Sequence, residues 1–309
     1  MKTRVITGIF IAAVYIAVML LTLYVHPIFF DVFIFLIAMG GVYEMSKALS
    51  ISFSPPILVL DIIAVVLSFG AFWFSQYFFK NSETYAAGMA GFFVALVVMI
   101  IVTVIVTTSS KVYVKGNALS TIFIMLYPTA LLMFSVGLNG FIDVGMPGVV
   151  GTTPQRSAGI ALMFLVPTFT DIMAYAVGST VKGKKLCPTI SPNKTISGAV
   201  GGLVGGLLGA GLVILVTYLA TKFSINLFGL SMLTDRWPTT IINLLALGLF
   251  GSVMDQLGDL FASYIKRKSG IKDFSKLLPG HGGVLDRVDG FIFCGVFFYM
   301  YFAFMILIV

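Results

Sequence analysis

Long apolar runs separated by short polar segments extend along the whole chain. A helix of about 20 apolar residues crosses the hydrocarbon core of a bilayer, where only helices or closed barrels satisfy the backbone. Runs this continuous favour helices. We therefore predict an all-α integral membrane protein with about nine transmembrane helices, at residues 5–25, 28–48, 57–79, 86–107, 119–138, 158–178, 197–221, 239–266 and 290–309.

The composition supports this class. Apolar residues make up 59% of the chain and charged residues only 10%, whereas a soluble domain carries about 25% charged residues. Basic residues before the first run could mark a secretory signal peptide. The run is longer than a typical signal core and more spans follow, so we interpret it as a retained helix. Cys187 and Cys294 form no CxxC pair, and neither a disulfide framework nor a zinc site is expected.

The distribution of Lys and Arg predicts the orientation. The N-terminus and the loops after spans two, four, six and eight share one side and carry 15 of the 19 basic residues. The opposite side carries Lys80, Arg156, Lys222 and Arg236. Because Lys and Arg mark the cytoplasmic side, we expect a cytoplasmic N-terminus, an external C-terminus and polar loops that face the cytoplasm.

The two most basic loops, 179–196 and 267–289, contain more than the Lys and Arg residues that set the membrane orientation. In the second, Gly280-His281-Gly282-Gly283 allows positive φ angles and close approach of a ligand. Successive backbone amides in such a segment can cradle an anion. His281 could donate to a phosphate oxygen, or it could be an ordinary loop histidine. Together with nearby basic residues, the segment suggests a phosphate site.

Carboxylates gather near the same loop. Asp255 and Asp259 lie four residues apart on one face of span eight, close to its cytoplasmic end, and Asp286 and Asp289 follow in the loop. Acids near lipid need partners, and oxygen ligands suit Mg²⁺. The residues that we predict to bind the metal are Asp259, Asp286 and Asp289. Salt bridges to Arg267 or Arg287 are the alternative.

The loop 179–196 carries four lysines and no acid. Asn193 or Thr195 can cap the helix that follows, and a helix N-terminus beside Lys194 suits a phosphate. The alternative is an ordinary helix cap beside lysines that only set the membrane orientation.

Span seven is rich in small residues, which we interpret as close helix packing. They form two rows, Gly198, Gly202 and Gly206, and Gly201, Gly205 and Gly209. The rows are also compatible with a homodimer. In span six, Asp171 is an intramembrane acid and hence a functional candidate.

Several segments together resemble one family. The run from Ser263 to Asp289, with KDFSKLLPGHGGVLDRVD at its centre, closely resembles the signature of the phosphatidate cytidylyltransferases, or CDP-diacylglycerol synthases. KLCPTISPNKT at 185–195, QLGDL at 256–260 and TRVITG at 3–8 are similar to further motifs of that family. Where the family tends to have DTGAY, residues 171–175 read DIMAY, so a role for Asp171 is not carried over. Residues 196–198 replace its usual Trp-Glu-Gly, so no role of that Glu is carried over either.

The resemblance implies transfer of a cytidylyl group from CTP to phosphatidic acid, with Mg²⁺ alone or with a second cation. Together with the apolar runs, it divides the chain into about five N-terminal spans in residues 1–157 and a catalytic region in residues 158–309, which contains about four spans and the two basic loops. The expected partners are CTP, phosphatidic acid and the bilayer of the cell (inner) membrane, and no nucleic acid. The expected roles are metal binding by the three acids named above, assisted by Asp273; phosphate binding by Lys194, Lys266, Arg267, Lys272 and Arg287; and substrate contacts from Ser191, Asn193 and His281.

Two other classes stay open. A transporter would use Asp171, Asp255 and glycine-broken helices near the midplane, although the acids cluster toward one surface and no such helix pair is evident. A CTP-dependent lipid kinase, or a cytidylyltransferase for an isoprenoid phosphate, is closer. Products separate these, because a kinase releases CDP and a cytidylyltransferase releases pyrophosphate. A purely structural protein would consume no nucleotide.

Overall fold

The computed structural model describes residues 2–79, 84–140, 154–223 and 237–308. Within these ranges, nine helical segments are long and apolar enough to cross a membrane, which confirms the predicted all-α membrane class. Lys80 and Arg236, two of the charges used for the orientation, lie outside the described residues. The elements are α1 (Lys2–Tyr24), α2 (Ile28–Ser52), α3 (Leu58–Phe78), α4 (Thr84–Ser109), α5 (Lys115–Ile124), η1 (Met125–Ala130), α6 (Leu131–Gly140), α7 (Pro154–Thr180), β1 (Lys185–Cys187), β2 (Ser191–Thr195), α8 (Ile196–Lys222), α9 (Trp237–Lys268) and α10 (Leu285–Ile308).

The chain forms two compact units that share α9 and α10. The first unit contains residues 1–22, 26–140 and 265–288. The second contains residues 23–25, 141–264 and 289–309. The predicted division at residue 157 concerned function rather than packing, and it stays a prediction.

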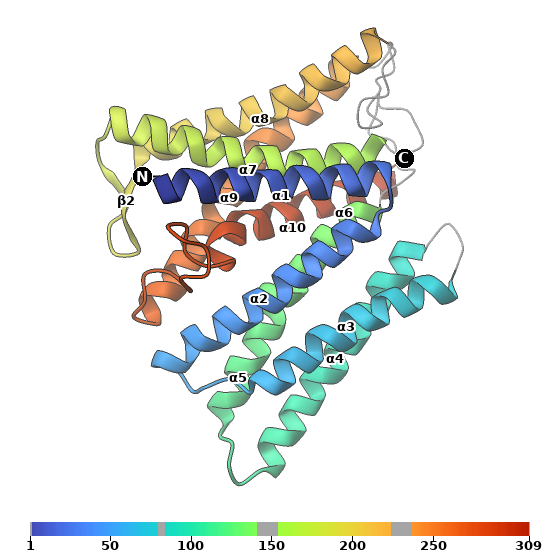
Figure 1. Ribbon diagram of the computed structural model, residues 1–309, viewed down its shortest axis with the longest axis vertical. Helices are drawn as coiled ribbons and strands as arrows, with labels where there is room; N and C mark the ends of the chain where they lie inside the picture. The colour runs from blue at the N-terminus through green and yellow to red at the C-terminus, as the bar shows by residue number, and fades with distance from the viewer. Residues whose placement is uncertain (1, 80–83, 141–153, 224–236, 309) are drawn as a thin grey trace. The chain divides into compact units, whose positions relative to one another are not determined.

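In the first unit, α3 and α4 lie side by side (Figure 1). The fifth span consists of α5, η1 and α6, and α2 packs against it. Aromatic rings fill the core, with Phe69 and Phe92 in an edge-to-face pair whose centroids are 5.3 Å apart. The fifth span is kinked rather than straight, because Pro128 interrupts it and Tyr127 leaves the helical backbone region.

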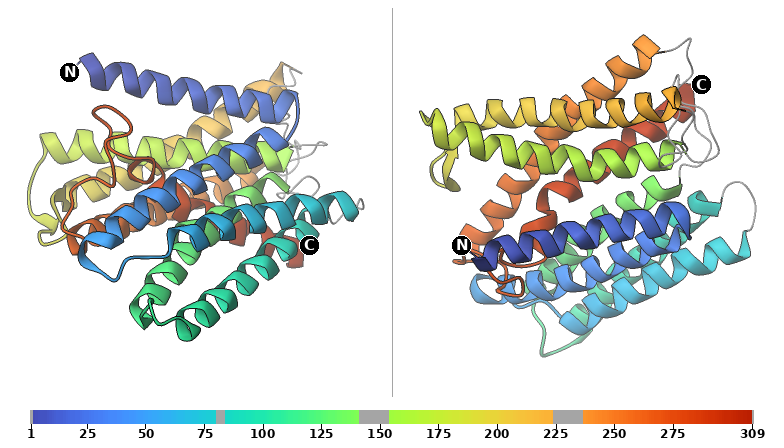
Figure 2. Two further views of the ribbon diagram at one scale, coloured as in Figure 1. Left: turned by 60° about the horizontal axis from the view of Figure 1, so that its bottom comes forward. Right: turned by 45° about the horizontal axis from the view of Figure 1, so that its top comes forward.

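In the second unit, α7 and α8 pack closely along the glycine rows (Figures 1 and 2). A Cβ on Gly205 would collide with the carbonyl of Phe169, and one on Gly209 would press on the carbonyl of Leu165. Gly206 faces α9 instead, against the carbonyl of Gly248. The interpretation of both rows as packing surfaces is confirmed for these positions.

The two basic loops are more ordered than the sequence predicted. In the first, β1 and β2 pair as an antiparallel hairpin, and Thr195 caps α8 because its Oγ1 accepts a hydrogen bond from Gly198 N at 3.0 Å. Asn193, the other predicted cap, lies in β2. In the second, α10 begins at Leu285 rather than at residue 290, and α9 extends to Lys268 rather than to residue 266. The first two and the last five residues of the predicted loop are therefore helical.

Candidate active site

The segment between α9 and α10, residues 269–284, folds back on itself and is called the signature loop below. Leu278 N donates to Gly282 O at 2.9 Å, and His281 N donates to Leu278 O at 2.8 Å. Gly280 and Gly282 have φ angles of 78° and 83°, a region that side chains with a Cβ rarely adopt. The predicted need for glycine in this turn is confirmed.

Asp286 binds the signature loop at two points and joins it to α9. Its Oδ1 accepts a hydrogen bond from Lys266 Nζ at 2.7 Å. Its Oδ2 accepts two further bonds, each 2.9 Å long, from the backbone amides of Phe274 and Gly283. The residue is buried. The predicted alternative of a salt bridge therefore holds for Asp286, with Lys266 as the partner instead of Arg267 or Arg287.

Lys266 is buried as well, which is rare for a lysine unless it is paired. Besides its bond to Asp286, its ammonium lies 5.3 Å from the centre of the Phe274 ring, within the range of a cation–π contact. Both contacts fix the side chain in the core of the loop.

Glu44 of α2 is a site residue that the sequence analysis missed. Its carboxylate accepts hydrogen bonds from Ser275 Oγ at 2.6 Å and from the amides of Val284 and Leu285 at 2.9 Å. It is 2% exposed, and it lies so close to Gly283 that no Cβ would fit there. Glu44 satisfies free amides at the start of α10, the end of a helix that favours a negative charge. The signal that could have found it is an acid within the apolar run 28–48.

The TRVITG segment of α1 contacts the same loop. Thr7 Oγ1 donates to Pro279 O at 3.0 Å. Gly8 faces the His281 imidazole, since a Cβ built on Gly8 would lie 3.6 Å from its Nε2. His281 Nδ1 is buried and has no hydrogen-bond partner within the described residues. Two motifs more than 270 residues apart in sequence therefore meet in the first unit.

The second unit contains a cluster of acids. Asp255, on α9, interacts electrostatically with Asp171 of α7, Asp259 of α9 and Asp289 of α10. Lys194 of β2 forms an ion pair with Asp259, with Nζ and Oδ2 2.5 Å apart. Asp255 is 3% exposed, and its Oδ2 has no hydrogen-bond partner among the described residues. Asp171, which the departure from the family motif left in doubt, thus belongs to this cluster.

The acids of this cluster would offer only carboxylate oxygens to a bound cation, and such ligands suit a hard cation. The buried Asp255 oxygen without a partner is a further observation that favours a bound cation. In the described part of the chain, however, no three His, Cys, Asp or Glu side chains are already placed to hold one metal ion. Metal binding by Asp259, Asp286 and Asp289 therefore stays a prediction.

The remaining predicted site residues lie at the surface. Lys272 and Asp273 are exposed in the signature loop, and Arg287 is exposed on the first turn of α10. Arg267 is exposed and donates to Ile271 O at 3.2 Å. In β2, Ser191 is half-buried and Asn193 exposed. Their predicted substrate contacts stay predictions.

Comparison with known proteins gives the family. The sequence profile of the cytidylyltransferase family matches residues 2–305, nearly the whole chain. The chain belongs to the cytidylyltransferase family. The resemblance inferred from the signature, the lysine-rich hairpin and the TRVITG segment is thereby confirmed.

Individual relatives are similar over shorter stretches. A phosphatidate cytidylyltransferase of Brucella abortus is 34% identical over 175 residues, which are 57% of this chain and 56% of the relative. One of Bacillus subtilis is 42% identical over 134 residues, or 43% of each chain. One of Staphylococcus saprophyticus is 37% identical over 153 residues, or 50% of this chain and 52% of the relative. The chain thus matches about half the length of these curated relatives.

Proposed function

We propose that the protein is a phosphatidate cytidylyltransferase, which joins CTP and phosphatidic acid to give CDP-diacylglycerol and pyrophosphate. Family membership and the names of the relatives support the proposal. The observation that carries it is the placement of the signature loop between the ends of two membrane-spanning helices, α9 and α10. The acyl tails of the substrate lie in the bilayer and its phosphate lies at the surface, so chemistry on that phosphate requires polar groups at this boundary.

The reaction forms a bond between an oxygen of the lipid phosphate and the α-phosphorus of CTP, and it breaks the bond to the β-phosphate, which leaves in pyrophosphate. The attacking oxygen is ionised near neutral pH, so no strong general base is needed. The main obstacle is repulsion between two polyanions. Positioning and electrostatic stabilisation therefore supply most of the catalysis in transfers of this kind.

Basic residues of the chain meet that requirement. Arg267, Lys272 and Arg287 are exposed and can bind phosphate groups directly. Lys194 and Lys266 hold carboxylates in the structure, and a bound nucleotide or lipid phosphate would compete for or share these cations. Ser191 and Asn193 of β2 would contact the nucleotide.

Asp259 and Asp289 would hold Mg²⁺, with Asp255 beside them, and Asp273 would assist from the loop. A bound Mg²⁺ neutralises phosphate charge and orients phosphate oxygens. Asp286 is also predicted to bind Mg²⁺, although its two oxygens already accept three hydrogen bonds.

We further propose that the protein lies in the cell (inner) membrane with its site toward the cytoplasm, where CTP is available. The excess of Lys and Arg on that side supports this orientation. The homodimer stays a prediction, because the glycine rows that suggested it pack against α7 and α9 of the same chain.

The experiment that tests the function uses purified protein in detergent with CTP, Mg²⁺ and one lipid phosphate at a time. The expected result is CDP-diacylglycerol from phosphatidic acid, an equal amount of pyrophosphate, and no reaction in EDTA. Release of CDP with a phosphorylated lipid would instead identify a kinase. A faster reaction with an isoprenoid phosphate would change the lipid substrate, and untouched CTP across all lipids would refute the proposal.

A further inference from the structure

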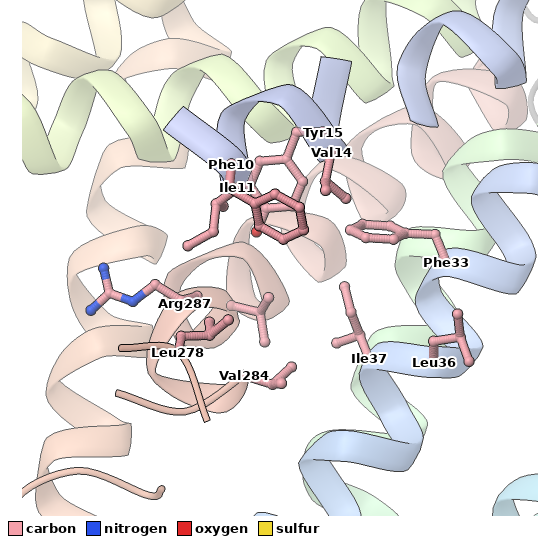
Figure 3. Close-up of a pocket in the computed structure, with 11 residues that line it drawn as sticks. Phe10, Ile11, Val14, Tyr15, Phe33, Leu36, Ile37, Leu278, Val284 and Arg287 are labelled. Atoms are coloured by element: carbon pink, nitrogen blue, oxygen red, sulfur yellow. The ribbon is translucent and has the colours of Figure 1, made fainter. Parts of the chain in front are cut away.

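An apolar cavity of about 380 Å³ lies among α1, α2, the signature loop and the first turn of α10, all within the first unit (Figure 3). On the α1 side it is lined by residues such as Ile11 and Val14, and on the α2 side by Phe33 and Ile37. The volume is in the range of small-molecule sites. The cavity is therefore large enough to take a hydrocarbon chain.

Exposed apolar side chains lie at the edge of the cavity. Phe10 of α1 and Leu36 of α2 both line it, and they are 62% and 60% exposed. In a membrane-spanning helix pair, such exposed apolar side chains face lipid. A chain can therefore enter sideways from the bilayer without crossing water.

Arg287 gives the cavity a polar edge. It is the charged residue among the described ones that line the cavity, and Figure 3 shows its guanidinium nitrogens pointing away from the apolar rings. No carboxylate in the described ranges forms an ion pair with it. A guanidinium binds phosphate oxygens through two parallel hydrogen bonds. An apolar cavity with one such cation at its edge matches a lipid that carries an anionic phosphate.

Part of the cavity wall is formed by the signature loop of the candidate active site. Leu278 and Val284, at the two ends of the loop's Gly-rich turn, both line it. Val284 N also donates to Glu44, and its neighbour Gly283 donates to Asp286. A tail in the cavity would thus lie against the segment whose backbone amides bind Glu44 and Asp286.

We propose that this cavity binds one acyl chain of a lipid phosphate monoester while Arg287 binds its phosphate. The identity of that lipid as the substrate rests on the proposed function. The assignment names α1 and α2 as the helices that present the lipid, which the sequence alone did not do.

The test uses a phosphatidic acid with a photoreactive diazirine in one acyl chain, in mixed micelles with the full-length protein. After irradiation, labelled peptides are located by mass spectrometry. The expected label lies in the α1 and α2 segments around Val14 and Ile37. Unlabelled phosphatidic acid should compete with the label, and phosphatidylcholine should not.

Two matched variants test the same cavity without relying on the reaction. Ile11→Trp fills the cavity, whereas Ile9→Trp places the same bulk on the same helix at a position that is 65% exposed and does not line it. Label should fall about tenfold in Ile11→Trp, as expected when roughly two buried methylenes are displaced. It should stay near the wild-type level in Ile9→Trp.

The outcomes separate this inference from the proposed function. Selective cavity labelling without any CDP-diacylglycerol formation would leave the lipid site standing and remove the proposed function. Product formation with label spread evenly over membrane-facing positions, with equal competition by phosphatidylcholine, or with full label in Ile11→Trp, would overturn the cavity assignment and leave the proposed function intact.

Discussion

Lys266 Nζ lies 2.7 Å from Asp286 Oδ1, and the two side chains are only 11% and 4% exposed. The pair joins the last turn of α9 to the first turn of α10. Because Asp286 also binds two amides of the signature loop, one carboxylate organises the whole segment between these helices.

We predict that removing either partner of this pair destabilises the protein strongly. Lys266→Met leaves a buried carboxylate without its cation, which typically costs about 3–5 kcal/mol. Thermal unfolding in detergent should show a clearly lower midpoint for Lys266→Met and for Asp286→Asn. The loss of stability in the double variant should be smaller than the sum of the losses in the two single variants, because each single change removes the same interaction. Additive losses would contradict the pairing.

Glu44 should hold the signature loop closed. Glu44→Gln keeps one carbonyl acceptor but loses the charge that strengthens three hydrogen bonds. We expect faster trypsin cleavage after the exposed Lys272 and Lys276 and at least about tenfold lower turnover, the effect of roughly 1.4 kcal/mol.

Asp61→Asn is the matched control for Glu44→Gln. Asp61 is also a buried acid of the first unit, on α3, and has no hydrogen-bond partner for its carboxylate within the described residues. Its removal should leave cleavage of the loop unchanged. Equal cleavage in both variants would show that general destabilisation, rather than the Glu44 contacts, opens the loop.

The dependence of activity on Mg²⁺ concentration should show which aspartates bind the metal. Asp259→Asn and Asp289→Asn are expected to raise the half-saturating Mg²⁺ concentration by about tenfold or more, since losing a group that holds or orients the metal typically costs 10–100-fold in affinity. Asp286→Asn should in addition lower the unfolding midpoint, because its two oxygens also hold the loop. Titration of activity with Mg²⁺ measures this. Unchanged Mg²⁺ requirements in the first two variants would remove their metal role.

Glycine packing between α7 and α8 gives a test of the fold itself. Gly205→Ala forces a Cβ onto the Phe169 carbonyl, whereas nothing lies within 4 Å of a Cβ on Gly211 of the same helix. Overpacking typically costs about 1–3 kcal/mol, so Gly205→Ala should lower the unfolding midpoint. Gly211→Ala should leave it unchanged or raise it, since alanine favours helix. Equal effects would contradict the observed helix contact.

The sequence predicted the spans well because their apolar runs are long and the loops between them short. It also predicted the glycine packing and the turn of the signature loop, which follow from the absence of a Cβ. It could not predict which cation pairs with Asp286, since six basic residues lie within 20 positions of it and the partner, Lys266, is the most distant of them. Glu44 was missed because its partners are more than 230 residues away, a distance that no local pattern records.

The start of α10 was misplaced for a related reason. Residues 285–289 read as polar loop because Asp286, Arg287 and Asp289 interrupt the apolar run. In the structure they are helical, since Glu44 satisfies the first amides and Asp286 is neutralised by Lys266. Tertiary contacts therefore extend the helix beyond its apolar part.

In the proposed reaction, the α-phosphate of CTP becomes part of a lipid. The most direct measurement follows CTP labelled either at the α- or at the γ-phosphate, with phosphatidic acid, Mg²⁺ and purified protein. The α-label should enter the lipid while the γ-label leaves in pyrophosphate. Entry of the γ-label into lipid, or of neither label, would contradict it.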